Sequence, residues 1–404
     1  MNGIIAFATN IQLYRQSSSH LYSGRMTSAA PAAAASTAVA VAAPPRPLFK
    51  RLVRTLVAPS TFDFWASQLR STWSWDRPLA RIVARRAESS DTFTLLLQPN
   101  RHWRGFRAGQ HLNIGAEIDG TLVTRSYSLS DAPRADGRIA ITVKAIPGGR
   151  LSQHLCHAAK PGDVLTLGPA FGEMTLPERP EGAWLFLAAG SGITPMMAMI
   201  RAQAAQGMPM PIALVYWART RAELCFVDEL RALAARLPDF RVDCVVTRDS
   251  DAADCGHGRI DGPSLSAFAP DLHQRRVFAC GPDGFVAAAR ELAAGRAVAF
   301  HAEAFTPPPC AAVDDGAAAG SVQITLAASG RTLDVPRGTP LLIALEAAGL
   351  KPASGCRMGI CNTCACGKRA GSTRHVHTGA VEREPVSALR LCVNSASSDL
   401  ILDL

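Results

Sequence analysis

Residues 354–364, near the carboxyl end, read SGCRMGICNTC and decide the fold of this part of the chain. Three cysteines stand there as C-x4-C-x2-C, and a fourth cysteine follows at position 392. In this spacing one loop supplies three thiolates to a two-iron, two-sulfur cluster, and a distant strand supplies the fourth. The sequence therefore predicts ligation by Cys356, Cys361, Cys364 and Cys392.

Zinc is the alternative metal, but C-x4-C-x2-C is not an ordinary zinc-finger spacing. Gly355 and Gly359 allow the loop to bend so that backbone N–H groups approach the sulfurs. We expect the neighbouring Cys366 to take no part, because it falls outside the pattern. The chain has 11 cysteines in 404 residues, and their spacing favours a reducing compartment over a disulfide framework.

The cysteine segment, with Leu391-Cys392 and a terminal strand at 400–404, resembles plant-type ferredoxin domains. The resemblance implies an α+β, β-grasp domain over residues 321–404. Strand signals at 322–326 and 332–335 and a short helix at 341–348 agree with it. This domain has a net positive charge, whereas plant-type ferredoxins usually carry an acidic surface.

Before the cysteine segment, the chain divides into two regions that differ in the spacing of their apolar residues. Strand signals separated by turns predict an antiparallel β-barrel over residues 76–178. Strands alternating with helices predict a doubly wound parallel sheet, an α/β domain, over residues 179–306. A Pro-, Ala- and Gly-rich stretch predicts a linker over 307–320. The expected barrel strands lie at 82–83, 92–97, 111–114, 121–129 and 139–143; the later strands lie at 183–188, 212–217, 242–246 and 277–279, with helices at 195–205, 222–235 and 284–294.

Three motifs in the barrel region have groups that suit a flavin. In residues 125–128, RSYS, a guanidinium can clamp a phosphate, a ring can cover the flavin and a hydroxyl can bond its N5 region. Residues 148–152, GGRLS, open a helix with Ser152 as its expected N-cap, which suits a pyrophosphate. Residues 168–172, GPAFG, then end the barrel.

The alternating region has a glycine turn after its first strand, LAAGSGITP at 187–195. We expect Thr194 to cap the next helix and Pro195 to occupy its first turn. Cys280-Gly281-Pro282 follows a later strand, and HAEAF at 301–305 resembles a closing strand.

In this order, the motifs resemble the ferredoxin–NADP reductase superfamily over residues 76–404. The resemblance implies FAD, with FMN as the alternative, together with NADPH or NADH. It places Ser128, Thr194 and Cys280 at the reacting centre; for Cys280 and Phe305 a core role is the alternative. The implied cofactor-binding residues are Arg125, Ser126, Tyr127, Ser128, Gly148, Gly149, Ser152, Gly168, Pro169, Gly190, Gly192, Thr194, Pro195, Arg219, Arg221, Cys280, Gly281, Pro282, Glu303 and Phe305.

Arg219 and Arg221 follow the second parallel strand, where a 2′-phosphate would lie, and favour NADPH over NADH. A surface role for either arginine is the alternative. A flavin reconciles a two-electron nicotinamide donor with a one-electron cluster. We therefore expect an enzyme that passes electrons from NAD(P)H through FAD and the cluster to an external acceptor.

Within the superfamily, the chain most resembles the reductases of acyl-CoA desaturases, on Phe64-Trp65, Trp73-Ser74 and residues 99–105, PNRHWRG. The reductase of a ring-hydroxylating dioxygenase or another monooxygenase is the alternative, and a non-catalytic iron–sulfur sensing module is a remote one. We expect a monomer in the cytoplasm, with peripheral contact at the inner face of the membrane through a membrane-bound acceptor.

Charge is unevenly distributed along the chain. Residues 1–62 have six Lys or Arg and no Asp or Glu, whereas the rest is close to neutral, which argues against a nucleic-acid partner. We expect residues 1–46 to be disordered or a leader; a start at Met26, a transit peptide and a secretory signal are the alternatives. Residues 47–75 have helical apolar spacing that predicts packing on the body, with a membrane-surface role as the alternative.

Overall fold

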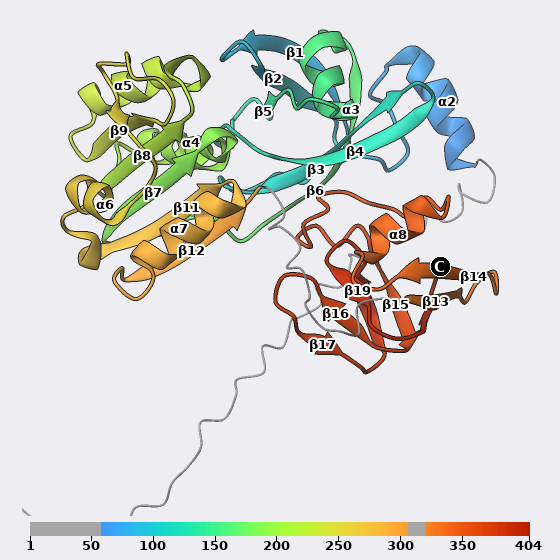
Figure 1. The fold of residues 1–404 in the computed structure, drawn as a ribbon. Helices are drawn as coiled ribbons and strands as arrows, with labels where there is room; N and C mark the ends of the chain where they lie inside the picture. The colour runs from blue at the N-terminus through green and yellow to red at the C-terminus, as the bar shows by residue number, and fades with distance from the viewer. Residues whose placement is uncertain (1–57, 306–319) are drawn as a thin grey trace, which may run out of the picture. The chain divides into compact units, whose positions relative to one another are not determined.

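The computed structural model describes residues 58–305 and 320–404 (Figure 1). The expectations for residues 1–46, for the first part of the 47–75 segment and for nearly all of the 307–320 linker fall outside these ranges. The described part begins with helix α2 (Pro59–Leu69). None of the helices in the described ranges combines the length and apolar character needed to cross a bilayer.

Six antiparallel strands form the first domain, in the order β4-β3-β6-β1-β2-β5. Leu129, just past β4, bridges to Ile141 in β5, so the two ends of the order meet and the sheet closes. Alternate strand residues fill the interior, among them Leu95, Leu112 and Ile141. The elements are β1 (Leu79–Ala87), β2 (Thr92–Pro99), β3 (His111–Ile118), β4 (Thr121–Ser128), β5 (Ile139–Lys144), α3 (Arg150–Gln153) with a following π-helical turn (His154–Ala158), and β6 (Val164–Phe171).

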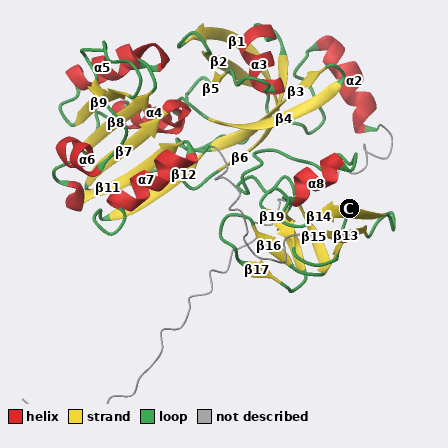
Figure 2. Cartoon of the chain, in the orientation of Figure 1, coloured by secondary structure: helices red, strands yellow, loops and turns green. Residues whose placement is uncertain are grey.

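The second domain is a parallel sheet in the order β10-β9-β8-β7-β11-β12, with helices on both faces (Figure 2). Its central strands are apolar throughout, as expected of strands covered on both sides. One core cluster joins the sheet to α4 and α5, and another joins it to α6 and α7. The elements are β7 (Ala183–Ala189), α4 (Ile193–Ala204), β8 (Ile212–Ala218), α5 (Val227–Arg236), β9 (Phe240–Val246), β10 (Gly256–His257), α6 (Gly262–Phe268), β11 (Arg275–Gly281), α7 (Asp283–Ala293) and β12 (Ala299–Ala304).

The third domain has a mixed five-stranded sheet in the order β14-β13-β20-β15-β18 and a small three-stranded sheet. Helix α8 buries Leu341, Leu342 and Leu345 in the core of this domain. The elements are β13 (Ser321–Leu326), β14 (Thr332–Pro336), α8 (Leu341–Ala347), β15 (Ala365–Ala370), β16 (Thr373–His375), β17 (Val381–Glu382), β18 (Val386–Arg390), β19 (Asn394–Ala396) and β20 (Leu400–Leu402).

The predicted architecture is confirmed: a barrel, a doubly wound parallel sheet and a smaller α+β domain. Two predicted helix caps are wrong. Helix α3 begins at Arg150 after Gly149, so Ser152 lies inside the helix rather than at its N-cap. Helix α4 begins at Ile193 after Gly192, which likewise places Thr194 inside its first turn. In both cases the tight glycine turn lets the helix start earlier than a hydroxyl-bearing residue would suggest.

Candidate functional site

A cavity of about 270 Å³ lies where the three motif regions meet. Barrel residues line most of it, while Thr194 comes from α4, Phe305 directly follows β12, and Cys356 and Met358 come from the cysteine loop. The predicted site residues that line it are Arg125, Ser126, Tyr127, Ser128, Gly149, Ser152, Thr194, Phe305 and Cys356. The fold therefore places parts of the flavin, nicotinamide and cluster motifs around one space.

Arg125 brings a half-buried positive charge to this cavity. Its Nη1 donates to the carbonyl of Thr124 at 2.7 Å, and no carboxylate of the described residues forms an ion pair with it. Burial, and then the positive charge of Arg357, lowers the pKa of Arg125. A half-buried guanidinium that forms no direct ion pair within the described residues is suited to a phosphate, so the residues present fit the phosphate groups of FAD.

The glycine turn before α3 brings backbone close to the same end of the cavity. Gly148 has φ +74°, and a Cβ on Gly149 would lie 2.5 Å from Ser152 Oγ. That hydroxyl accepts from the N–H of Ile146 and donates to the carbonyl of Gly149, each at 3.2 Å. Ser152 therefore stabilises the turn itself. Gly168 and Pro169 lie in β6, outside the cavity lining, with Gly168 packed against Asn113.

At the other end, the buried side chains of Ser128 and His111 and the half-buried side chain of Glu303 form a chain of polar contacts. Ser128 Oγ lies 2.8 Å from His111 Nδ1, and His111 Nε2 lies 2.5 Å from Glu303 Oε2. Ser128 ends β4, His111 begins β3 and Glu303 lies in β12, so this chain joins the barrel to the parallel sheet. His111 and Glu303 thus fix the position of the hydroxyl that faces the cavity.

The nicotinamide turn is defined by close backbone packing. A Cβ on Gly192 would lie 2.0 Å from the carbonyl oxygen of Cys280, so only glycine fits there. Gly190 has φ +55°, and Thr194 Oγ1 donates to the carbonyl of Ser191 at 2.9 Å. Pro195 follows in the first turn of α4, and Pro282 is the N-cap residue of α7.

Cys280 and Gly281 lie at the end of β11, against the nicotinamide turn. Cys280 is fully buried, and burial raises the pKa of its thiol well above the ordinary value. It does not line the cavity, so its surroundings are those of a packed neutral thiol. Gly281 packs on Ala189, which holds the two strand ends together.

The two arginines expected at a 2′-phosphate are already paired with carboxylates. Arg219 contacts Glu223 at 2.9 Å, and Arg221 contacts Asp254 at 3.0 Å. Both arginine side chains are more than half exposed, at 53% and 55%. Hydrogen bonds from Arg231 and Arg221 lower the pKa of Asp254 to about 2. A nucleotide phosphate would therefore compete with these carboxylates.

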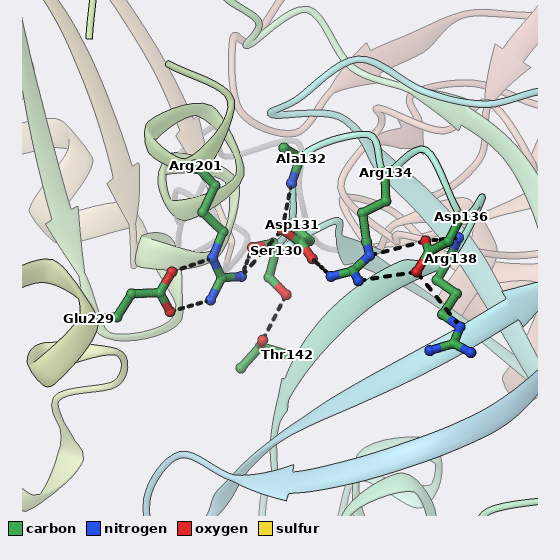
Figure 3. Close-up of polar contacts among 9 residues, drawn as sticks. All are labelled: Ser130, Asp131, Ala132, Arg134, Asp136, Arg138, Thr142, Arg201 and Glu229. Carbon is green, nitrogen blue, oxygen red and sulfur yellow. Dashed lines mark hydrogen bonds and ion pairs between the residues drawn. The ribbon is translucent and has the colours of Figure 1, made fainter. Parts of the chain in front are cut away.

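A polar network fixes the loop that follows the RSYS motif to the parallel-sheet domain (Figure 3). Arg201 of α4 forms two hydrogen bonds with the carboxylate of Glu229, at 2.8 and 2.7 Å. Its remaining nitrogen donates to the carbonyl of Ser130 at 2.6 Å. The Oγ of Ser130 in turn accepts from Thr142 at 2.8 Å. Arg201 therefore links the flavin motif to the helix that follows the nicotinamide turn.

Backbone donors surround the sulfurs of the cysteine loop. The N–H of Cys356 donates to Cys361 Sγ at 3.2 Å, and the N–H of Gly359 donates to Cys392 Sγ at 3.2 Å. Cys356 Sγ accepts from Met358, Ile360 and Cys361 at 3.3–3.4 Å. Such donors stabilise negative charge on sulfur, as cluster ligation requires. The described residues therefore fit a 2Fe-2S cluster.

Hydrogen bonds within two cysteine pairs shift the thiols in opposite directions, and those of Cys356 and Cys392 have raised pKa values. A hydrogen bond from Cys356 lowers the pKa of Cys361 to about 4, and one from Cys392 lowers that of Cys364 to about 6. By contrast, burial raises the pKa of Cys366 to about 12. Raised pKa values therefore occur in two predicted ligands as well as in Cys366, and the exclusion of Cys366 stays a prediction from the spacing.

Sequence reasoning missed three residues of the site. His111 and Arg201 belong to no motif, and their roles depend on partners distant in the chain. Asn113 is the third: it accepts from Ser126 at 2.5 Å and donates to Thr363 of the cysteine loop at 2.9 Å. The sequence placed His111 and Asn113 in an expected strand. The alternation of side chains along a strand, however, does not distinguish a site residue from a core residue.

Three family models match the chain. They are an oxidoreductase FAD-binding domain over residues 80–175, an oxidoreductase NAD-binding domain over 186–291 and a 2Fe-2S iron-sulfur cluster binding domain over 324–393. Their order is that of the three domains observed here.

Two relatives and one solved structure match most of the chain. An NADPH oxidoreductase of Mycobacterium tuberculosis is 34% identical over 88% of this chain and 92% of that protein. The glycine betaine monooxygenase reductase subunit of Pseudomonas aeruginosa is 30% identical over 82% and 96%, respectively. The structure of phthalate dioxygenase reductase matches with TM-score 0.56 at 24% identity, over 81% of this chain and 97% of that one, and shares the fold.

Proposed function

Because the chain belongs to the ferredoxin reductase-type oxidoreductases that bind FAD, NAD(P)H and a 2Fe-2S cluster, we propose that it delivers electrons to an oxygen-activating iron enzyme. The observation that carries this proposal is the shared cavity, which flavin-motif, nicotinamide-motif and cysteine-loop residues line together. When bound, the flavin accepts an electron pair from the reduced nicotinamide, and the cluster passes electrons on singly.

In this proposal, the chain's own residues bind and orient the cofactors. Arg125 and the turn at Gly148-Gly149 hold the flavin phosphates, while Tyr127 covers the ring system. Ser128, held by His111, presents its hydroxyl at the reacting edge. The close packing of Gly192 on Cys280 fixes the position of the nicotinamide turn, and Thr194 lies at the start of the helix that follows it. Cys356, Cys361, Cys364 and Cys392 hold the cluster.

We propose NADPH as the preferred donor, with Arg219 and Arg221 contacting its 2′-phosphate. Both are exposed enough to be reached, and both would have to share their charge with Glu223 and Asp254. This competition predicts a modest preference for NADPH over NADH rather than an absolute one.

For the acceptor, the first candidate is an oxygenase component. The relative from Pseudomonas aeruginosa is a monooxygenase reductase subunit, and the match covers 82% of this chain and 96% of that one. A reductase of this class supplies single electrons to a separate oxygenase.

The second candidate is an acyl-CoA desaturase, the acceptor that the sequence predicts. A specific observation favours it: Phe64, Trp65 and Trp73, which lie in the stretches that suggested it, are exposed on the described surface, where a partner or a bilayer can reach them.

Reconstitution distinguishes the candidates. The anaerobically purified holoprotein should show flavin and iron–sulfur absorption, and NADPH should bleach both more efficiently than NADH. The protein is then supplied with a purified membrane-bound acyl-CoA desaturase or with a Rieske-type oxygenase, and product formation is measured. Turnover with the oxygenase alone supports the first candidate, and turnover with the desaturase alone supports the second. A cluster without NADPH-dependent bleaching would contradict the proposed electron path.

A further inference from the structure

Exposed apolar side chains are concentrated at the start of the described chain. Ten large hydrophobic residues of the described ranges are exposed, and four of them lie within ten positions. These four, Phe64, Trp65, Leu69 and Trp73, are called here the aromatic face. Trp65 is 66% exposed and Leu69 78% exposed. Single exposed apolar residues are common, but such a concentration indicates an interaction surface.

The aromatic face is held in place by α2 and the turn that follows. Asp63 accepts hydrogen bonds from the backbone N–H of Trp75 at 2.6 Å and from Arg77 at 2.8 Å. Phe62 packs edge-on against Trp75 with 5.3 Å between ring centroids, and Ala66 is buried. The opposite side of this segment is thus packed on the protein, so the exposure of the aromatic face is not a consequence of a loose helix.

A basic groove adjoins the aromatic face. It is a cavity of about 900 Å³ whose lining includes Leu69 and Trp73 together with Arg70, Arg81 and Arg101, and no carboxylate. The guanidinium of Arg70 lies over the ring of Trp73, 5.6 Å from its centroid. Apolar rings and guanidinium groups therefore occur side by side, the arrangement of side chains at a bilayer interface.

The sequence before the aromatic face is positively charged, as the groove is. Residues 1–62 contain six basic side chains and no acidic one. The surface of a protein partner presents charges of both signs, whereas an anionic bilayer attracts a segment whose basic residues are not offset by acidic ones. The charge complementarity thus favours a lipid surface over a protein partner.

We propose that the aromatic face docks on an anionic lipid bilayer, with Trp65 and Trp73 at the interface and lipid phosphates bound by Arg70, Arg81 and Arg101. Tryptophan prefers this depth because its ring is apolar and its N–H remains hydrated. The docking would hold the reductase at the membrane surface, within reach of a membrane-bound acceptor. This inference goes beyond the proposed function, because lipid binding requires neither nucleotide nor acceptor.

Flotation of the full-length holoprotein with lipid vesicles tests the proposal. The wild type should float with vesicles of phosphatidylcholine and phosphatidylglycerol, weakly with phosphatidylcholine alone, and less as salt is raised. Trp65→Ser/Trp73→Ser should reduce binding about tenfold or more. Arg70→Gln/Arg101→Gln should remove the preference for anionic lipid. Ile343→Ser, a matched control that changes an exposed apolar residue of α8, should bind like the wild type.

Reduction of ferricyanide by NADPH in the same preparations checks that each variant is folded and loaded. The proposal is overturned if the wild type does not float, or if the double tryptophan variant floats normally while retaining this activity. It is also overturned if the aromatic variant only raises the KM for a purified acceptor in the absence of lipid, because the face would then be a protein-docking site. Failure of vesicle binding would leave NADPH-dependent bleaching intact, so the two proposals fail separately.

Discussion

The cysteine loop and the flavin end of the cavity are built in opposite ways. Three of the four predicted cluster ligands lie within nine residues, and the loop's own N–H groups surround the sulfurs. At the flavin end, the hydrogen bond between His111 and Glu303 joins residues 192 positions apart. A site made by local backbone can be identified from spacing, whereas a site made by the meeting of distant strands becomes visible only in the fold.

Replacement of a ligand in the local site should have the largest effect. Cys361→Ser removes a thiolate whose pKa is held low, and we expect loss of the iron–sulfur absorption and of electron delivery to a protein acceptor. Reduction of ferricyanide through the flavin should persist. Cys366→Ser, which changes the neighbouring thiol with its raised pKa, should keep the cluster spectrum. Loss of the cluster in this control would show that the spacing misidentified the ligands.

Breaking the non-local site should slow the first electron transfer without removing a cofactor. His111→Phe keeps an aromatic ring but leaves Ser128 and Glu303 without their shared partner. We expect the flavin to be bleached by NADPH about 10- to 100-fold more slowly in stopped-flow measurements, because the hydroxyl loses its fixed position.

Two comparisons make this second test specific. His301→Phe changes an exposed histidine of the neighbouring β12 and should leave the rate unchanged. His111→Gln retains a side chain able to form hydrogen bonds and should recover part of the rate. A normal rate in His111→Phe, at normal FAD content, would mean that Ser128 needs no support.

Features with a local sequence signal could be predicted, whereas features that depend on residues distant in the chain could not. The strands of the barrel and of the parallel sheet can be predicted because short apolar segments bounded by turns are local signals, and the cysteine spacing is local as well. Helix starts were misplaced at Ser152 and Thr194, since a tight glycine turn can replace a hydroxyl cap. Arg201 could not be identified from the sequence, because a charged residue in a helix is expected to face solvent unless its partners on the barrel loop are known.

The Arg201 network should contribute to stability more than to chemistry. The side chain is only 16% exposed, so Arg201→Met leaves Glu229 unpaired and the carbonyl of Ser130 without its donor. We expect a loss of about 1–3 kcal/mol in unfolding free energy, measured by chemical denaturation. Arg134→Met is the matched control from the same network: that arginine is 42% exposed, and its removal should cost less than about 1 kcal/mol. Equal losses would contradict a special role for Arg201.

The smallest effect is expected where the sequence pointed to arginines but could not show their partners. Asp254→Asn weakens the carboxylate's hold on Arg221, so the KM for NADPH should fall about two- to threefold while that for NADH stays constant. Because the folded pKa of Asp254 is about 2, below the ordinary 3.8, its ion pairs contribute fully above pH 3.8 and are lost as pH falls through about 2. The difference between variant and wild type should therefore be constant across neutral pH. If neither Asp254→Asn nor Arg221→Gln changes the preference for NADPH over NADH, both side chains have a surface role and do not contact the nucleotide.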